Sequence, residues 1–479
     1  MNSLTITWIT LPFFVGFVGY LLPKLDRYLA LGMTLVSASY AVRALMEPAP
    51  LTLHLMDHFG VTLMVDAQSS YFILTNALVT AAVILYCWDT GKTAFFYTQT
   101  IILHGSVNAV FICADFISLY VALEVIGIAA FLLVSYPRTN RAIWVALRYL
   151  FISNTAMLFY LVGAILVYQA NHSFAFAGLQ GAPPEALALI FMGLLTKGGI
   201  FVSGLWLPLT HSESETPVSA LLSGVVVKTG VFPLARMALM LDGVAPIITL
   251  FGLGTALFGV SYALFEQDTK RMLAQSTISQ LGFILAAPAV GGFYALTHGL
   301  VKSALFLSAG TLPSRNLQEL HQRPIQRSLW VVLVMASCSI SGVPLWAGFA
   351  SKALTLKTLL PWQMIVMNVA TVGTIATFAK LIFLPHQQES SPARTIKPGF
   401  WIAILLLLGA LLAANGFYLQ AYTLANIGKA LAKIGSGWLV YWVIVRRIVL
   451  KLPRVQEQLE HLIGGMSLML VLLFWMVWA

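Results

Sequence analysis

The sequence predicts an all-α, polytopic membrane protein, with essentially the whole chain in one membrane domain. Hydrophobic residues make up 59% of the 479 residues and charged residues only 9%, too few charges to cover the surface of a soluble protein of this length. Apolar runs of about 20 residues, long enough to cross a bilayer as a helix, recur from end to end. The runs are continuous rather than alternating, which argues against transmembrane strands.

The apolar runs define the expected spans, each close to the length that a bilayer requires. They are 5–22, 28–46, 67–88, 94–113, 114–135, 142–169, 186–208, 217–237, 244–265, 272–289, 291–312, 328–358, 363–384, 399–423 and 463–478. The first is expected to be a retained span rather than a cleaved signal, because no basic residue precedes it and no A-x-A-like site follows it. The run 328–358 is too long for one helix and is expected to break near Gly342 and Pro344.

The C-terminal part of the chain has a different composition. It contains the basic stretch GKALAKIGSGWLVYWVIVRRIVLKLP, which either spans the membrane or lies along its interface as an amphipathic helix. We therefore expect two parts: a transmembrane domain over residues 1–425, and a basic segment followed by a final transmembrane helix over residues 426–479.

The net charge of +10 is explained by basic residues at lipid headgroups, because nucleic-acid binding would need a solvated domain that the sequence lacks. Connections are numbered here from the first span. The odd ones carry Lys24, Arg27, Lys92, Arg138, Arg141, Lys270, Arg271, Arg315, Arg323, Arg327, Arg394 and Lys397, and the even ones little beyond Arg43, Arg236 and Lys357. This asymmetry predicts that the odd connections are cytoplasmic and that the N-terminus is outside.

No cofactor or metal site is expected in this chain. Cys87, Cys113 and Cys338 lie far apart and form neither a C-x-x-C pair nor an iron–sulfur spacing. No G-x-G-x-x-G opens a βαβ unit, so no nucleotide or flavin site is predicted. Any redox chemistry must therefore belong to a partner chain.

Two predicted spans resemble one another. The run 186–208 contains Lys197 and is interrupted by Pro208, and the run 328–358 contains Pro344 followed by Lys352. They lie about five spans apart, so they cross the membrane in opposite directions. Paired broken helices of this kind indicate an inverted-topology repeat and line substrate paths near the membrane midplane.

Six ionisable residues fall inside the apolar runs, where a charge at the bilayer centre costs about 2.5–3.5 kcal/mol on insertion scales. They are Glu124, Lys197, Lys228, His298, Lys302 and Lys352. Each has an ordinary alternative: Lys352 extends to the headgroups, His298 packs between helices, and Glu124 pairs with a lysine only to remain buried. Taken together, titratable groups across the middle of the membrane predict a proton route.

Paired titratable groups can pass protons. Burial in general lowers the pKa of a lysine and a carboxylate neighbour raises it again, so a Glu–Lys pair that opens and closes switches the lysine between holding and releasing a proton. A broken helix exposes carbonyls and amides that bind water, and water chains carry protons. We therefore predict that Lys197 is a proton site and that the break hydrates it.

Four motifs follow one another from the first break to the second. They are a lysine followed by W-L-P-x-x-H, P-x-S and a second lysine (Lys197, Trp206, Leu207, Pro208, His211, Pro217, Ser219, Lys228), QDTKRMLAQSTISQLGFIL with Asp268, Lys270, Arg271 and Ser276, THGLVKSALFLSAG, and GVPLWAGFASK. With these motifs the chain resembles the antiporter-like membrane subunits of respiratory complex I, its photosynthetic relatives, membrane-bound hydrogenases and Mrp-type cation/proton antiporters. The resemblance weakens before about residue 65 and after about residue 390.

The resemblance implies two inverted five-helix repeats within about fourteen transmembrane helices. It also implies a first pair, a central relay, two following groups and a terminal site, which correspond in that order to Glu124 with Lys197, to Lys228, to His298 with Lys302, and to Lys352. The chain departs from the family at FVSG, where Val202 and Gly204 replace part of F-P-x-H, and at Tyr294, where a histidine often stands. The proton route is therefore expected to be shorter or more dependent on water.

Three functions fit these features. The first is a proton-translocating subunit of a complex-I-like NAD(P)H- or ferredoxin–quinone oxidoreductase, driven by redox chemistry in partner subunits. The second is a subunit of an Mrp-type antiporter that exchanges Na⁺ for H⁺. The third is a structural scaffold that has lost transport, against which the buried Lys and Glu residues argue. The expected partners are other membrane subunits and lipid, in a prokaryotic plasma membrane or a thylakoid membrane.

Overall fold

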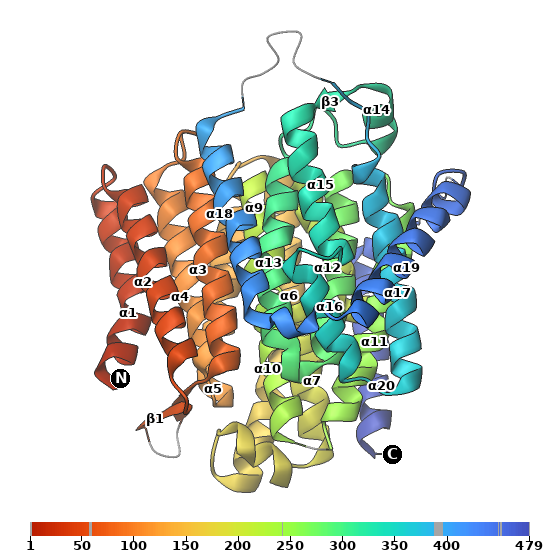
Figure 1. The fold of residues 1–479 in the computed structure, drawn as a ribbon. Coiled ribbons are helices and arrows are strands. Elements are labelled where there is room, and N and C mark those ends of the chain that lie inside the picture. The colour runs from red at the N-terminus through yellow and green to blue at the C-terminus, as the bar shows by residue number, and fades with distance from the viewer. Residues whose placement is uncertain are drawn as a thin grey trace.

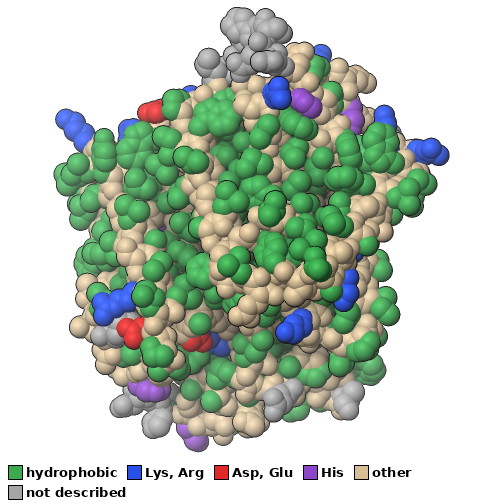
Figure 2. Space-filling view, viewed as in Figure 1, with side chains coloured by type: hydrophobic (Ala, Val, Ile, Leu, Met, Phe, Trp, Pro, Cys, Tyr) green, Lys and Arg blue, Asp and Glu red, His purple; other side chains and the backbone are tan. Residues whose placement is uncertain are grey.

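The structure, a computed structural model, describes residues 2–56, 60–241, 243–387, 396–448, 450 and 453–478. Thirteen helical segments among these residues are long and apolar enough to cross a membrane, and Figure 1 shows them packed side by side as one bundle. Hydrophobic side chains cover much of the face seen in Figure 2, and charged side chains are sparse on it. The chain is an integral, multi-pass, all-α membrane protein, as the sequence predicts.

The first six spans are single helices whose bounds agree with the prediction within a few residues. They are α1 (Asn2–Leu21), α2 (Asp26–Met46), α3 (Ala67–Cys87), α4 (Ala94–Ile112), α5 (Phe116–Val134) and α6 (Asn140–Asn171). Side-chain caps fix several of their starts, because a cap oxygen satisfies an amide that the helix leaves free. Asp66 caps α3, Asp115 caps α5 and Thr139 caps α6.

The connection between α2 and α3 holds a feature that the sequence analysis did not predict. β1 (Leu51–Met56) and β2 (Gly60–Val65) pair as an antiparallel hairpin. The hairpin lies at one end of the bundle rather than within it (Figure 1). It therefore adds strands to a connection and leaves the all-α membrane region unchanged.

Besides the span Thr216–Met240, which contains a π turn, six unbroken spans lie in the second half of the chain. They are α11 (Ala245–Phe265), α12 (Thr269–Ala286), α13 (Pro288–Ala309), α17 (Pro361–Ile382), α18 (Pro398–Asn415) and α20 (Leu459–Trp478). The connection after α13 holds the short helix α14 (Leu317–Gln322) and the strand β3 (Ile325–Gln326), which pairs with β4 (His386–Gln387). In the described residues, two further membrane crossings add to the thirteen apolar segments: α12, and the broken span α15–α16 described next.

Two spans are broken, and both breaks follow the same local pattern. The first consists of α7 (Pro184–Gly198), a 3₁₀ turn (Phe201–Leu205) and α8 (Trp206–Glu213), and the second of α15 (Arg327–Ser341) and α16 (Ala347–Lys357). Each leading helix ends at a left-handed glycine, Gly199 at φ 68° and Gly342 at φ 82°, a conformation that glycine adopts without a Cβ penalty.

The position of the first break corrects the prediction. The sequence analysis assigned the interruption to Pro208, but the helix ends at Gly199, and Pro208 is the third residue of α8. Proline is tolerated there because the first-turn amides of a helix have no intrahelical partner. The second break lies where it was expected, with Pro344 between α15 and α16.

The C-terminal segment links the two broken helices. α19 (Leu424–Val440) continues as a π turn to Val445 and crosses α17 obliquely (Figure 1). α20 then packs against α7 and the turn Phe201–Leu205. The basic segment is thus an oblique helix that packs against α17. The final span covers the first break.

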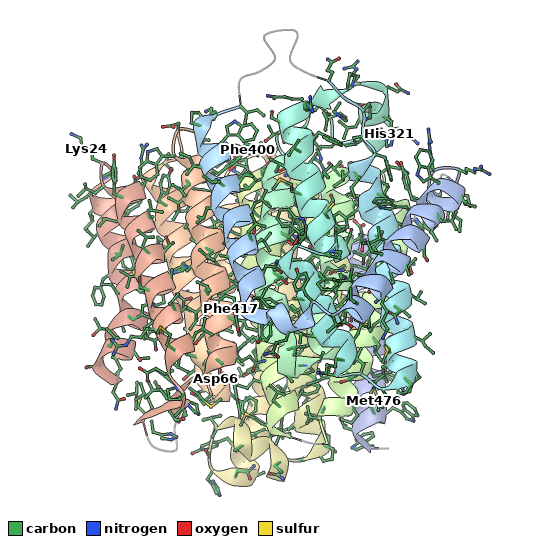
Figure 3. All side chains as sticks on the ribbon, in the orientation of Figure 1. Lys24, Asp66, His321, Phe400, Phe417 and Met476 are labelled. Carbon is green, nitrogen blue, oxygen red and sulfur yellow. The ribbon has the colours of Figure 1, made fainter. Side chains whose placement is uncertain are left out.

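Two of the odd connections lie at the same end of the bundle. Lys24 and His321, from the first and a later odd connection, lie at one end, and Asp66 and Met476 lie at the other (Figure 3). Both chain termini lie at the second end (Figure 1). These two odd connections therefore share one face, while Arg394 falls outside the described residues. The cytoplasmic assignment of that face remains a prediction.

Candidate functional site

The five basic side chains of the predicted path are buried within the bundle. Lys197, Lys228, His298, Lys302 and Lys352 have exposed fractions of 3%, 0%, 2%, 0% and 6%. None of them forms an ion pair within 4.0 Å with a carboxylate in the described part of the chain. Glu124 is half-buried on α5. Neutral oxygens accept hydrogen bonds from three of them, Lys197, Lys228 and Lys302.

Lys197 lies in the last turn of α7, directly before the break. Its Nζ donates a hydrogen bond to Ser153 Oγ on α6 at 2.6 Å. A Cβ at Gly127, one turn after Glu124, would lie 3.2 Å from that Nζ, so the absent side chain makes room for the ammonium group. Glu124 Oε1 is buried without a hydrogen-bond partner. The two residues thus face the same region through Ser153 and Gly127 but do not touch.

Lys228 begins α10 (Lys228–Met240), directly after a π turn over Leu222–Val226 that follows α9 (Thr216–Leu221). The wider π turn leaves carbonyls free of the ordinary helical pattern. Lys228 Nζ donates to two of them, Gly224 O at 2.6 Å and Ser223 O at 3.2 Å. The distortion of the helix therefore supplies the acceptors for a lysine with 0% exposure.

Hydrogen bonds connect this turn to Lys302 on α13. Ser223 Oγ and Thr277 Oγ1 lie 2.7 Å apart, and Thr277 donates to Leu273 O at 2.9 Å. Lys302 Nζ donates to the same Leu273 carbonyl at 2.8 Å. Two lysines on different helices are thus joined through hydroxyls and carbonyls only.

His298 and Lys352 line one small cavity of about 10 Å³, close to the volume that one water requires. Both ring nitrogens of His298 and Nζ of Lys352 lack hydrogen-bond partners in the described residues. Lys352 Nζ lies 4.2 Å from the ring centroid of Phe283, a cation–π contact. Tyr294 lines the same cavity and donates to Gln280 Oε1 at 2.6 Å.

Lys352 does not behave as a headgroup anchor in the structure. Its exposed fraction is 6%, and it lies beside the second break, where a Cβ at Gly342 would come within 2.9 Å of Lys352 Cδ. An extended lysine would have carried its amino group to the surface. The second break therefore holds its lysine inside the bundle.

Four of the predicted supporting residues lie apart from this series. Asp268 caps α12 by accepting from Arg271 N at 3.0 Å and pairs with Arg315 at 2.8 Å, at the end of the bundle. His211 on α8 stacks on Phe306 at 4.7 Å. Pro208 and Pro344 shape the chain near the breaks and contribute no titratable group.

Sequence reasoning missed the neutral links and one further buried lysine. Ser153, Ser223 and Thr277 carry no motif that distinguishes them from other serines and threonines of membrane helices. Lys380 is 4% exposed and donates to the carbonyls of Ala263, Leu264 and Glu266. It lies in the last turn of α17, and the sequence analysis did not single it out.

One family of known proteins matches more than half of the chain. The family of transmembrane chains described as NADH:quinone oxidoreductase/Mrp antiporter matches residues 113–377. The chain belongs to this family. It is an antiporter-like membrane chain of the kind found in complex-I-like and Mrp-type assemblies, and all six predicted path residues lie within the matched region.

Individual relatives extend the likeness beyond the matched region. The chain is 27% identical to an Na⁺/H⁺ antiporter subunit of Alkalihalophilus pseudofirmus, over 87% of this chain and 94% of that protein. It is 28% identical to an NAD(P)H-quinone oxidoreductase chain 4 of Microcystis aeruginosa, over 75% and 77%.

Solved structures share the fold of this antiporter-like chain. A chain of an archaeal membrane-bound sulfane sulfur reductase superposes with a TM-score of 0.77 at 22% identity, covering 91% of this chain and 98% of that chain. A chain of the Mrp complex from a Dietzia species superposes with a TM-score of 0.74 at 20% identity, covering 96% and 99%. At these identities the superpositions establish a common fold.

Proposed function

We propose that the protein is a proton-translocating subunit of a multisubunit membrane assembly. One observation carries the proposal: five buried basic side chains have no carboxylate within 4.0 Å in the described residues and instead contact hydroxyls, carbonyls and a water-sized cavity. Charges in a membrane interior are costly and are found mainly where they work on ions or protons. The proposed path comprises Glu124, Lys197, Lys228, His298, Lys302 and Lys352.

Protons suit this path better than metal cations do. Lysine and histidine hold a proton and release it, and serine or threonine hydroxyls both accept and donate. A sodium ion would need several oxygen ligands and would meet four lysines along the described path, with Glu124 as its only carboxylate. We therefore assign H⁺ as the ion that this chain moves, whether or not the assembly also moves Na⁺.

Each residue takes a role along the path. Glu124, half-buried on α5, and Lys197 form the first group, with Ser153 between the two helices. Lys228 is the central relay, and Lys302 is joined to it through Ser223 and Thr277. His298 and Lys352 share the small cavity at the second break, where Lys352 is the terminal group.

The leading proposal for the whole assembly is a complex-I-like quinone oxidoreductase in which partner subunits carry the redox centres. Similarity to chain 4 of NAD(P)H-quinone oxidoreductases supports it. The nearly full-length match to the Na⁺/H⁺ antiporter protein of Alkalihalophilus pseudofirmus favours an Mrp-type antiporter as the second candidate. In either assembly we propose that the face with the odd connections is cytoplasmic, in a prokaryotic plasma membrane or a thylakoid membrane.

The test is proton transfer by the assembly reconstituted in sealed vesicles. Lys197→Ala should abolish transfer while the subunits still co-purify, whereas the exposed Lys24→Ala should transfer protons as the unmodified protein does. Normal transfer by the Lys197 variant would refute the path. Proton transfer that requires quinone reduction would identify the redox assembly, and transfer driven by a sodium gradient alone would identify the antiporter.

A further inference from the structure

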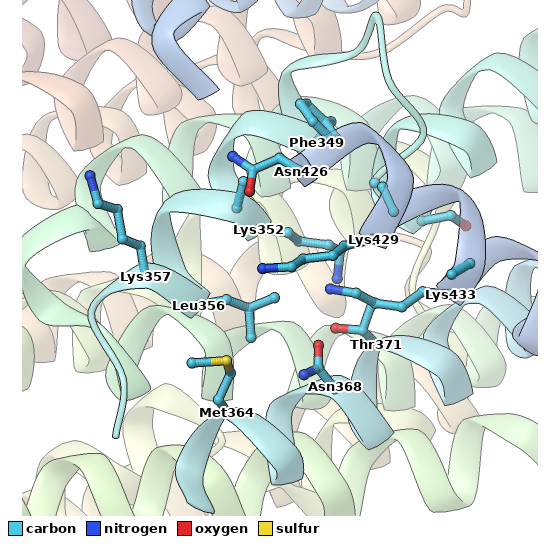
Figure 4. Close-up of a pocket in the computed structure, with 15 residues that line it drawn as sticks. Phe349, Lys352, Leu356, Lys357, Met364, Asn368, Thr371, Asn426, Lys429 and Lys433 are labelled. Atoms are coloured by element: carbon cyan, nitrogen blue, oxygen red, sulfur yellow. The ribbon is translucent and has the colours of Figure 1, made fainter. Parts of the chain in front are cut away.

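A cavity of about 550 Å³ lies beneath the oblique helix α19, bounded by α16 and α17 (Figure 4). Four of its lining residues are lysines: Lys352, Lys357, Lys429 and Lys433. Lys429 and Lys433 are one helical turn apart on α19, a spacing that places both on one face, and Figure 4 shows their side chains reaching toward Lys352. We call this space the lysine cavity.

The positive charge of the lysine cavity has no counterpart in the described residues. No Asp or Glu is among the residues that line it, and none of its four lysines forms an ion pair within 4.0 Å there. Two of its buried polar atoms, Lys352 Nζ and Asn368 Oδ1, lack hydrogen-bond partners. Buried polar atoms are normally satisfied, and several lysines around one space attract an anion.

The rim of the cavity is apolar. Leu424, Leu431 and Ile365 beside it are 89%, 56% and 65% exposed, which is typical of side chains that face lipid. Trp362, 52% exposed at the start of α17, is of the type enriched at headgroup level. Lys352 lies five residues before Lys357, the last residue of α16, which corresponds to about 7.5 Å along the helix axis.

These features distinguish a lipid from a soluble anion. A phosphate that arrives from water would be best held by a polar rim, whereas a phospholipid presents its phosphate to lysines and its acyl chains to apolar side chains. The wall of the lysine cavity also contains Phe349, Leu356 and Met364.

We propose that the lysine cavity binds the phosphate headgroup of an anionic phospholipid, held by Lys429 and Lys433 with its acyl chains along the apolar rim. The lipid phosphate supplies the negative charge that the cavity lacks, beside the second broken helix. The site does not require Lys352 to carry protons, so its test is independent of the proposed function.

The test measures lipid retained by the full-length protein in its assembly. Nanodiscs of phosphatidylcholine and phosphatidylglycerol serve as the source, and native mass spectrometry counts the phosphatidylglycerol molecules that remain bound. Lys429→Gln/Lys433→Gln should lose one bound molecule and bind it about 30-fold more weakly, since each lysine contributes about fivefold toward an anionic lipid. Lys24→Gln/Lys397→Gln, two lysines outside the cavity, should retain it.

A charge-preserving variant separates binding from folding. Lys429→Arg/Lys433→Arg should keep the lipid, because arginine retains the positive charge. Equal retention by the unmodified and the glutamine-substituted proteins would overturn the proposal. A second result would also overturn it. In lipid-free detergent, inorganic phosphate would protect Lys429 and Lys433 from an amine-labelling reagent as completely as phosphatidylglycerol does. Release of a partner subunit with unchanged lipid would also overturn it, and would indicate a protein carboxylate as the anion.

Discussion

The close contact between α7 and α10 offers a quantitative test of how the path is held together. A Cβ built at Gly230 would lie 2.3 Å from Gly198 N and 2.5 Å from Leu194 O, both backbone atoms of α7. Non-bonded heavy atoms rest about 3.5 Å apart, so Gly230→Ala must separate the two helices by about 1 Å. These helices carry Lys197 and Lys228, and the substitution therefore widens the distance between two proposed proton sites.

The expected effects of Gly230→Ala on stability and on the rate of proton transfer can be estimated. Overpacking costs about 1–3 kcal/mol, and the gain in helix propensity of about 1 kcal/mol offsets only part of it. Where reacting groups must meet, a displacement of about 1 Å can cost about 10²-fold in rate. We expect a lower unfolding midpoint in detergent and at least about a tenfold loss of proton transfer per folded molecule in reconstituted vesicles.

Two glycines of α18 provide controls. A Cβ at Gly399 would lie 2.4 Å from Leu85 O, away from the path, whereas nothing lies within 4 Å of a Cβ at Gly409. Gly399→Ala should lower the unfolding midpoint but preserve transfer per folded molecule, and Gly409→Ala should change neither. If Gly230→Ala transferred protons normally and unfolded like Gly409→Ala, the argument from helix contact would be refuted.

Three further outcomes are expected. Glu124→Gln should lower transfer, and combining it with Lys197→Ala should be no worse than the lysine change alone; additive losses in the double-mutant cycle would count against a functional pair. At Lys352 the expected order of transfer is Lys > Glu > Gln ≈ Arg, because arginine cannot release its charge, and full activity of Lys352→Arg would reduce the residue to an anchor. Cysteines placed in the loop 314–327 should react with impermeant reagents from the cytoplasmic side, and a cysteine near the N-terminus from the other side; labelling of the loop only from outside would invert the topology.

Much of the fold follows from local sequence. Continuous apolar runs located the spans, since the energy of leaving water depends on the composition of each segment and hardly on its neighbours. Glycine and proline marked both broken regions, and the regular alternation of basic connections separated the two faces. The first break shows the limit of this reasoning, because Pro208 attracted the assignment whereas the left-handed Gly199 ends the helix.

Identifying the proposed path required both the sequence and the tertiary structure. Sequence indicated the charged residues, because an ionisable side chain in an apolar run is conspicuous on its own. It could not indicate Ser153, Ser223 or Thr277, whose hydroxyls matter only because helices far apart in the chain bring them to a lysine. Nor could it show that the ammonium group of Lys197 lies against Ser153 rather than against the carboxylate of Glu124.

The sequence by itself determined the solvent, the approximate ends of most spans, and which ionisable residues fall within apolar segments, because each depends on residues that are neighbours along the chain. Tertiary structure alone decided which acceptors satisfy those charges, that Lys352 turns inward, and that Lys429 and Lys433 from a C-terminal helix join it around one cavity. The physical reason is range: insertion into a membrane is a local free energy summed over one segment, whereas hydrogen bonding and electrostatic pairing depend on distances of a few ångströms between helices, which only their packing fixes.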